Sequence, residues 1–307
     1  MKHSLKITLI LLAMFFLSQL VGLAVIHSYS PTISQTTDAN GTIVNVTNYN
    51  LPYGMAPPQG TDANVNLISI VLAVIIAALA MFFLMKFGAN VFLRIWFLFV
   101  ITLALGITIN SLIQNVAYSS IIALIVALPF ALIKVFQRNI IVHNITEVLI
   151  YPGIAAIFVP LLNVWTVSLL LVLISLYDMY AVWHSGSMQK MAKYQIKQLK
   201  IFSGFFIPYL GRKEKDLVRN SRISKNKKVK NLKVSVAILG GGDVVFPMIL
   251  AGVVLNTLGL IPALMISIGA TIALAVLFYF SEKGKFYPAM PFISIGCFIA
   301  LALAYII

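Results

Sequence analysis

The sequence predicts an all-α integral membrane protein that crosses the bilayer nine times, because of its composition and the length of its apolar runs. Of the 307 residues, 61% are hydrophobic and only 10% are charged. Soluble domains have roughly 45–50% apolar and about 25% charged residues. Runs of about 20 apolar residues, the length that crosses a bilayer, recur from one end of the chain to the other. We therefore expect a single membrane domain over residues 1–307.

Nine apolar runs are long enough to be spans. They cover Leu5–Ile26, Leu67–Met85, Phe92–Leu112, Ala117–Phe136, Val142–Leu161, Val164–Trp183, Val236–Leu255, Gly259–Phe280 and Tyr287–Ile307. Lys2 precedes the first run and Lys6 lies at its start, as basic residues do before the core of a signal peptide. However, it is longer than the usual core of roughly 7–15 residues, and no A-x-A site follows it. We therefore favour a retained first span over a cleaved signal peptide.

Two longer connections interrupt the spans, and they have opposite character. Residues 28–66 are rich in polar residues, proline and glycine, contain no Lys or Arg, and hold N-x-T sequons that begin at Asn40 and Asn45. Residues 185–235 hold fourteen of the 22 Lys and Arg residues. We expect the first segment to be an external loop between spans one and two. The second is expected to be a basic cytoplasmic loop between spans six and seven.

The remaining basic residues predict the orientation of the chain. All of them lie in the N-terminal segment, in turns, or within three residues of the end of a span, on the same face as the basic loop. The positive-inside rule then places the N-terminus in the cytoplasm and the C-terminus outside, in a multi-pass protein of the cell membrane. Orientation and attraction to anionic lipid headgroups account for the net charge of +14. We therefore expect contact with membrane lipid and no nucleic-acid partner.

Three of the eight acidic residues fall inside the expected spans: Glu147, Asp178 and Asp243. An ionised carboxylate in hydrocarbon costs at least a few kcal/mol, so an acid within a span is a functional-site candidate. On a helix, Asp178 would lie about 9 Å and Asp243 about 12 Å from the cytoplasmic ends of spans six and seven. Two consecutive antiparallel helices would then carry carboxylates at nearly the same depth, where they can share a site.

The residues around Asp243 strengthen this hypothesis. We expect Gly240, Gly241 and Gly242 to lie in a helix interior, where each glycine costs about 1 kcal/mol relative to alanine. Glycine allows a substrate backbone or a neighbouring helix to approach the carboxylate closely. Pro247 cannot donate an N–H to the carbonyl of Asp243, which leaves that oxygen free for water or substrate. The alternative reading is small-residue helix packing with a proline kink.

Three motifs in this order resemble the presenilin and signal-peptide-peptidase family of intramembrane aspartyl proteases. Tyr177-Asp178 resembles the YD motif, Gly240-Gly241-Gly242-Asp243 matches G-x-G-D, and Pro288-Ala289-Met290-Pro291 resembles PAL followed by proline. They fall on spans six, seven and nine, and the resemblance is strongest to archaeal presenilin homologues. Met290 departs from the family leucine, which is an apolar exchange of similar volume.

The resemblance implies a presenilin-like fold and proteolysis of transmembrane substrate helices. It assigns catalysis to Asp178 and Asp243, and it assigns substrate positioning to Tyr177, the glycine run and the segment Pro288–Pro291. Two close carboxylates hold one proton between them, so one can act as general base on water while the other polarises the scissile carbonyl. The implied partners are single-span membrane proteins or signal peptides, and no cofactor is expected.

Other candidate residues are weaker. Glu147 lies four residues after His143, which favours an interfacial i,i+4 pair over a catalytic or gating role. His184 is interpreted as an interface residue. The apolar stretch Leu199–Leu210 is compatible with a surface-bound segment or with a solvated loop. With one cysteine, Cys297, and no H-x-x-H or H-E-x-x-H motif, the sequence predicts no metal site.

Two other functions remain as alternatives. A proton- or cation-coupled transporter could use Asp178 and Asp243 as its ion site. Their expected depth near the cytoplasmic face and the lack of matched broken helices in the two halves of the chain disfavour it. The prepilin peptidases also use a G-x-G-D aspartate, but they do not account for the YD motif, the proline motif or nine spans.

Overall fold

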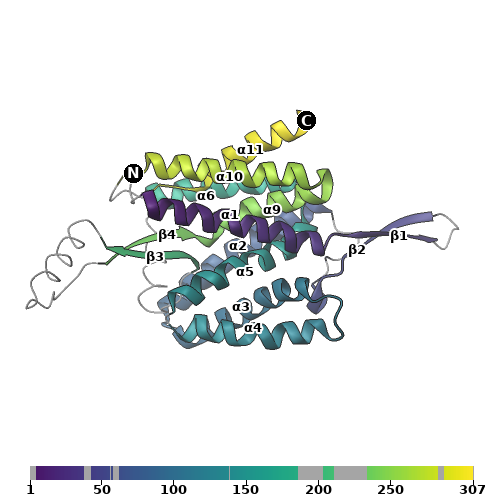
Figure 1. The fold of residues 1–307 in the computed structure, drawn as a ribbon, viewed down its shortest axis with the longest axis horizontal. Coiled ribbons are helices and arrows are strands. Elements are labelled where there is room, and N and C mark those ends of the chain that lie inside the picture. The colour runs from purple at the N-terminus through teal and green to yellow at the C-terminus, as the bar shows by residue number, and fades with distance from the viewer. Residues whose placement is uncertain are drawn as a thin grey trace, which may run out of the picture.

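The computed structural model describes residues 5–37, 43–55, 57, 62–137, 139–185, 203–210, 234–282 and 287–306. Within these residues the fold is a bundle of nine α-helices with an antiparallel hairpin at each end (Figure 1). The helices are α1 (Leu5–Ser28), α2 (Ala63–Lys86), α3 (Asn90–Leu112), α4 (Ser119–Phe136), α5 (Ile140–Phe158), α6 (Val164–Tyr180), α9 (Gly241–Leu258), α10 (Leu260–Phe280) and α11 (Met290–Ile306).

The strands form two separate two-stranded sheets. They are β1 (Thr32–Thr37), β2 (Ile43–Asn48), β3 (Gly204–Leu210) and β4 (Val234–Gly240). β1 pairs with β2 inside the segment expected to be an external loop, and β2 contains the sequon that begins at Asn45. Asn40 lies outside the described residues.

The prediction of nine helices is confirmed. In the part of the chain that the structure describes, eight helices are long and apolar enough to cross a bilayer. The ninth, α11, is an apolar helix of 17 residues. α1 packs against α5, α9 and α10, so it is a structural member of the bundle.

The predicted start of the seventh span is wrong. Val234–Gly240 is a strand, so the helix begins at Gly241 instead of Val236. The segment alternates as a strand does: Ala237 and Leu239 are buried, whereas Ile238 is 41% exposed. The apolar run continues without a break into α9, so hydropathy alone did not separate the strand from the helix.

The two readings of the stretch Leu199–Leu210 are also replaced. Residues 199–202 lie outside the described part of the chain, but Gly204–Leu210 forms β3 and pairs with β4. Phe205 is fully buried. This part of the stretch is therefore a paired strand with a buried aromatic side chain.

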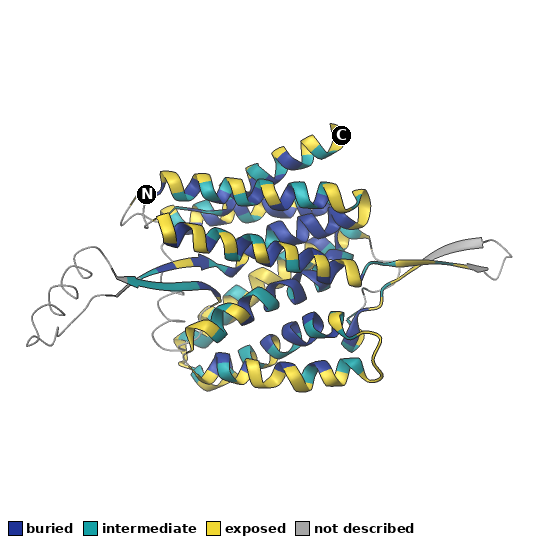
Figure 2. Ribbon diagram, in the orientation of Figure 1, coloured by how far each residue is buried: buried dark blue, intermediate teal, exposed yellow. Residues whose placement is uncertain are grey.

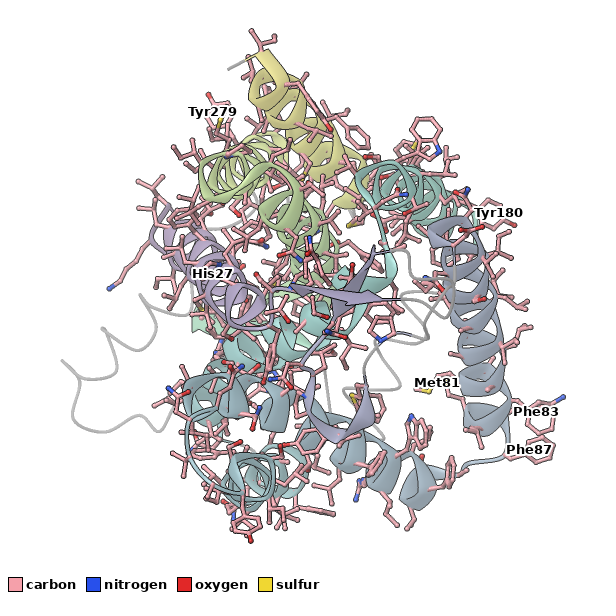
Figure 3. All side chains as sticks on the ribbon, turned by 90° about the vertical axis from the view of Figure 1, so that its right-hand side faces the viewer. His27, Met81, Phe83, Phe87, Tyr180 and Tyr279 are labelled. Carbon is pink, nitrogen blue, oxygen red and sulfur yellow. The ribbon has the colours of Figure 1, made fainter. Side chains whose placement is uncertain are left out.

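The packing is centred on α9, which contacts α1, α5, α6, α10 and α11. Buried residues gather on the inward faces of the helices, and exposed apolar residues cover the outer faces (Figure 2). In a bilayer, lipid covers such outer faces. α2 stands at the rim of the bundle, where Phe83 and Phe87 point away from the other helices (Figure 3).

Candidate active site

Asp178 lies near the end of α6 and is buried. The helix begins with a capping box, in which Thr166 N–H donates to the side chain of Asn163 at 2.8 Å and Asn163 N–H donates to Thr166 Oγ1 at 2.9 Å. After Tyr180 the chain continues as one turn of π-helix, Ala181–Ser185. The Asp178 side chain therefore projects from the last regular turn of α6, a position where a π-helical turn often marks a functional site.

The start of α11 meets Asp178. The backbone N–H of Met290 donates to Asp178 Oδ2 at 3.1 Å, and the N–H of Ala289 also bonds to this carboxyl. Pro288 precedes the helix and is buried, whereas Pro291 lies in its first turn. Proline lacks a backbone N–H. At the start of a helix this N–H would have no acceptor within the helix, so proline costs no hydrogen bond there. The proline motif thus presents backbone donors to the Asp178 carboxylate, a role that the sequence alone did not predict.

A second contact between α6 and α11 lies one helical turn away. Ser175 Oγ and Ser294 Oγ are 2.9 Å apart and both are buried. Ser175 precedes Asp178 by three residues, so the two side chains lie on the same face of α6. The sequence reasoning missed this pair, although the helical spacing from Asp178 and Met290 was a signal that could have found it.

Asp243 is the third residue of α9. Gly240 is the N-cap residue with extended backbone (φ −64°, ψ 145°), and its N–H donates to the Asp243 carboxylate. This is one half of a capping box, in which a side chain at the third helical position binds the N-cap N–H, because Gly240 has no side chain to make the other half. The predicted depth of 12 Å along a helix is therefore wrong, because the preceding residues belong to β4.

The glycine run occupies the junction between β4 and α9, not a helix interior. A Cβ on Gly241 would stand 2.9 Å from Tyr151 Cε1 and 2.9 Å from Ser203 Oγ. A Cβ on Gly240 would stand 3.1 Å from Asp243 Oδ2, whereas one on Gly242 would meet only Phe246, at 3.6 Å. The close approach that the sequence predicted occurs at Gly241, where side chains of the protein itself lie against the glycine. Gly242 is exposed.

The structure brings Asp178 and Asp243 to one place. α6 and α9 pack against each other, and the two carboxyl groups are close enough to interact electrostatically. Asp178 is only 6% exposed, whereas Asp243 is partly exposed. Each of the two carboxyl groups has a backbone N–H donor beside it, and the charge of Asp178 acts on Asp243.

The similarity to known proteins agrees with this geometry. A family model described as "Signal-peptide peptidase, presenilin aspartyl protease" matches residues 43–307. The chain belongs to this family. It is a multi-pass membrane protein and an aspartic endopeptidase of the intramembrane-cleaving type.

Solved structures support the fold of the protease. Two crystal forms of "a presenilin family intramembrane aspartate protease" match the chain at 18% identity. In the C222 form the TM-score is 0.58, with 95% of this chain and 94% of that chain covered. In the P2 form the TM-score is 0.61, with 96% of each chain covered. No curated protein matches the sequence.

Tyr177 of the protease is 57% exposed. It precedes Asp178 by one residue, so on α6 its side chain leaves the helix about 100° away from the carboxyl group. Tyr177 and Asp178 therefore face different surroundings.

Gln19 is a site-adjacent residue that the sequence reasoning missed. It is fully buried on α1, and its Nε2 donates to the carbonyl of Val244 at 2.9 Å. Pro247 is buried inside α9 and has no N–H for the carbonyl of Asp243. The signal that could have found Gln19 was a polar side chain within an apolar span.

The interpretation of Glu147 needs correction. Its i,i+4 pair with His143 is present, with His143 Nε2 and Glu147 Oε1 3.7 Å apart. However, Lys134 lies closer, at 2.5 Å, and the Glu147 side chain is only 1% exposed. Glu147 is therefore part of a buried cluster rather than an interfacial residue. His184 has no described side chain.

Proposed function

We propose that Asp178 and Asp243 are the catalytic dyad of this protease and that they hydrolyse peptide bonds within transmembrane segments. The observation that supports the proposal is that Asp178 and Asp243 lie on α6 and α9, which pack against each other, within electrostatic reach of one another and with Asp178 bound by the start of α11. These are the three segments that hold the YD, G-x-G-D and proline motifs.

The reaction follows from one proton shared by the pair. The ionised carboxylate removes a proton from water, whose oxygen attacks the scissile carbonyl carbon, while the other carboxyl donates its proton to the carbonyl oxygen. The resulting gem-diol gives a hydroxyl proton to the carboxyl group that is now ionised, the C–N bond breaks, and the leaving nitrogen takes its proton from the carboxyl group that removed one from water. Proton transfer by positioned side chains of this kind contributes about 10²–10⁴-fold to a rate.

We further propose that the neighbouring residues position the substrate. Gly242 is exposed beside Asp243 and leaves room for a substrate backbone, and the exposed phenol of Tyr177 offers a contact at the surface of α6. The N–H of Gly240 supports Asp243, and the N–H groups of Ala289 and Met290 hold Asp178. Gly241, Pro288 and Pro291 shape the backbone on either side of these donors. The substrates proposed are single-span membrane proteins or signal peptides within the lipid bilayer.

The cleavage reaction can be tested with purified protein. We expect the protease in lipid vesicles to cut at least one member of a panel of single-span substrates inside its transmembrane segment, with the products identified by mass spectrometry. Failure to cut any substrate, together with uptake of protons or cations by the same vesicles, would favour the transporter alternative.

We also propose that the N-terminus and residues 185–235 face the cytoplasm and that the C-terminus lies outside, because every basic residue falls on one face of the predicted topology. A cysteine placed at Lys225, in a variant with Cys297 replaced by alanine, should resist a membrane-impermeant thiol reagent in sealed cells. Strong labelling from outside would reverse the orientation.

A further inference from the structure

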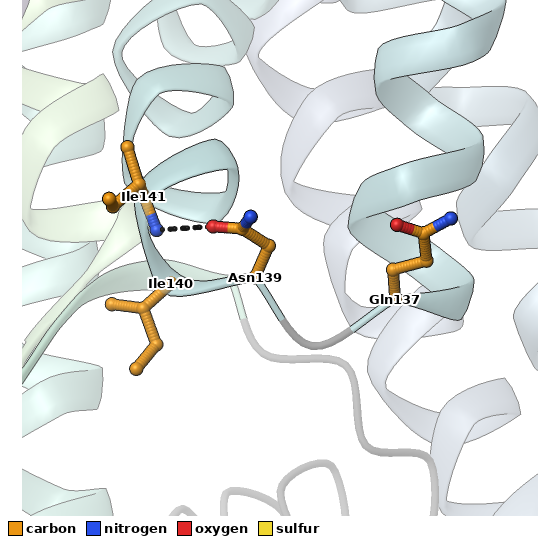
Figure 4. Close-up of a pocket in the computed structure, with 4 residues that line it drawn as sticks. All are labelled: Gln137, Asn139, Ile140 and Ile141. Carbon is orange, nitrogen blue, oxygen red and sulfur yellow. Dashed lines mark hydrogen bonds between the residues drawn. The ribbon is translucent and has the colours of Figure 1, made fainter.

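A buried ion pair joins α4 to α5. Lys134 Nζ and Glu147 Oε1 are 2.5 Å apart, and the two side chains are 2% and 1% exposed. Asn139, the N-cap residue of α5, lies next to the end of α4. Its side chain accepts the N–H of Ile141 at 3.0 Å (Figure 4). Replacing a buried ion pair by apolar residues is often neutral or stabilising. Bundle stability alone therefore does not explain why two charges lie here.

The ion pair reaches the hairpin through Gly204, the first residue of β3. The N–H of Gly204 donates to Glu147 Oε1 at 3.2 Å, and Nε2 of His143 donates to the carbonyl of Gly204 at 2.9 Å. Lys134 Nζ lies 3.4 Å from the other ring nitrogen of His143. Because the ammonium group can only donate, it favours the tautomer in which His143 Nε2 carries the proton.

Asn144 binds the same strand two residues further on. Its Nδ2 donates to the carbonyl of Phe206 at 2.9 Å, and its Oδ1 accepts the N–H of Phe206 at 3.0 Å. Residues two apart direct their backbone groups to the same edge of a strand. Side chains of α5 therefore satisfy the edge of β3 that faces away from β4. A two-stranded hairpin is marginal by itself, and here α5 takes the place of a third strand.

The clamped strand lies directly opposite the start of the catalytic helix. Gly204 pairs with Gly240, which is the N-cap of α9 and the donor to Asp243. Tyr151, one turn after Glu147, packs edge-on against Phe205 at 5.6 Å. Its ring also fills the space next to Gly241. α5 thus contacts β3 and the first turn of α9 at once.

We propose that His143, Asn144 and Glu147, together with Lys134, form an edge clamp that positions Asp243 through the β3–β4 hairpin. These are positioning residues, because they act on Asp243 through the hairpin. The inference rests on the proposed catalytic dyad. A displacement of about 1 Å in a catalytic group can lower a rate by about 100-fold, so a fixed register at the β4–α9 junction matters for catalysis.

A matched pair of double variants isolates one hydrogen bond. Lys134→Met with Glu147→Gln removes both charges but keeps a carbonyl oxygen for the N–H of Gly204. Lys134→Met with Glu147→Leu removes both charges and the acceptor. We expect the leucine pair to have a kcat at least about tenfold lower than the glutamine pair, with KM within about twofold. Equal kcat values would overturn the role of Glu147.

Asn144→Leu and Thr146→Val form a second comparison on the same helix. Thr146 is more deeply buried than Asn144, and its hydroxyl donates to the carbonyls of Val142 and His143 within α5. We expect Asn144→Leu to lower kcat at least about tenfold while Thr146→Val leaves it within about twofold. Equal losses in both variants, or in neither, would contradict the edge clamp.

Hydrogen exchange separates failure of the clamp from failure of the dyad, since it needs no activity. In Asn144→Leu and in the leucine pair, peptides covering β3 and the junction of β4 with α9 should exchange at least about tenfold faster than in the wild type. Unchanged exchange in either peptide would overturn the clamp, whatever the activity. A wild-type protein that cleaves nothing while its variants show the expected exchange would overturn the dyad, and with it the positioning role.

Discussion

α9 and α2 are both apolar membrane helices, but α9 is buried among the other helices whereas α2 is exposed at the rim of the bundle. The protein buries 67% of the 18-residue span of α9 and only 11% of that of α2, although α2 is the more hydrophobic of the two. Lipid tails are as apolar as leucine, so a helix can satisfy its apolar surface without protein contacts. Of these two helices, the more hydrophobic one is therefore the one exposed to lipid. The less hydrophobic helix, with its aspartate and glycines, lies at the centre.

The largest expected difference between the two regions is catalytic. Asp243→Ala removes one member of the proposed dyad and should lower the cleavage rate at least about 100-fold. Asp62→Ala is a matched control, because Asp62 is the N-cap of α2 and its side chain makes no capping hydrogen bond. It should keep wild-type activity, measured by the release of cleaved substrate at equal amounts of folded protein.

Substantial cleavage by Asp243→Ala would remove this residue from the catalytic role. A comparable loss of cleavage rate in Asp62→Ala would show that an acid at the rim of the bundle contributes as much to activity as one at its centre. The proposed functional difference between α2 and α9 would then be wrong.

A smaller difference is expected for stability. Leu250→Ala in α9 removes a side chain with 0% exposure and should lower the free energy of unfolding by about 2–4 kcal/mol, through lost contacts and a cavity. Leu79→Ala in α2 changes a side chain that is 65% exposed and should cost less than about 0.5 kcal/mol. Unfolding by sodium dodecyl sulfate in mixed micelles measures both values. Equal losses would mean that α2 is packed by protein in the membrane.

The smallest expected effect concerns single polar contacts. A double-mutant cycle of Ser175→Ala and Ser294→Ala should give a coupling free energy of about 0.6 kcal/mol, as is typical between membrane helices. Ser69→Ala in α2 serves as the control, since its hydroxyl donates to Val65 of its own helix at 2.9 Å. Combined with Ser294→Ala, it should be additive. A coupling of zero between Ser175 and Ser294 would argue against their contact between α6 and α11.

Much of this fold could be predicted from the sequence because apolar runs of membrane-spanning length are a strong signal. Acids inside such runs are rare, so Asp178 and Asp243 stood out before their surroundings were known. The start of α9 could not be placed, because β4 and the helix form one apolar run. The partners of Glu147 could not be predicted either, since Lys134 and Gly204 lie on other elements and hydropathy gives no information about pairing between them.

Cleavage by asparagine variants tests the central claim most directly. Asp178→Asn, Asp243→Asn and the double variant keep the size of each side chain but cannot act as an acid–base pair. Residues that act as one catalytic unit are strongly non-additive. We therefore predict the same residual rate for all three variants in a single-turnover assay with a single-span substrate. A double variant that is slower than either single variant by the product of their separate effects would contradict a shared dyad of Asp178 and Asp243.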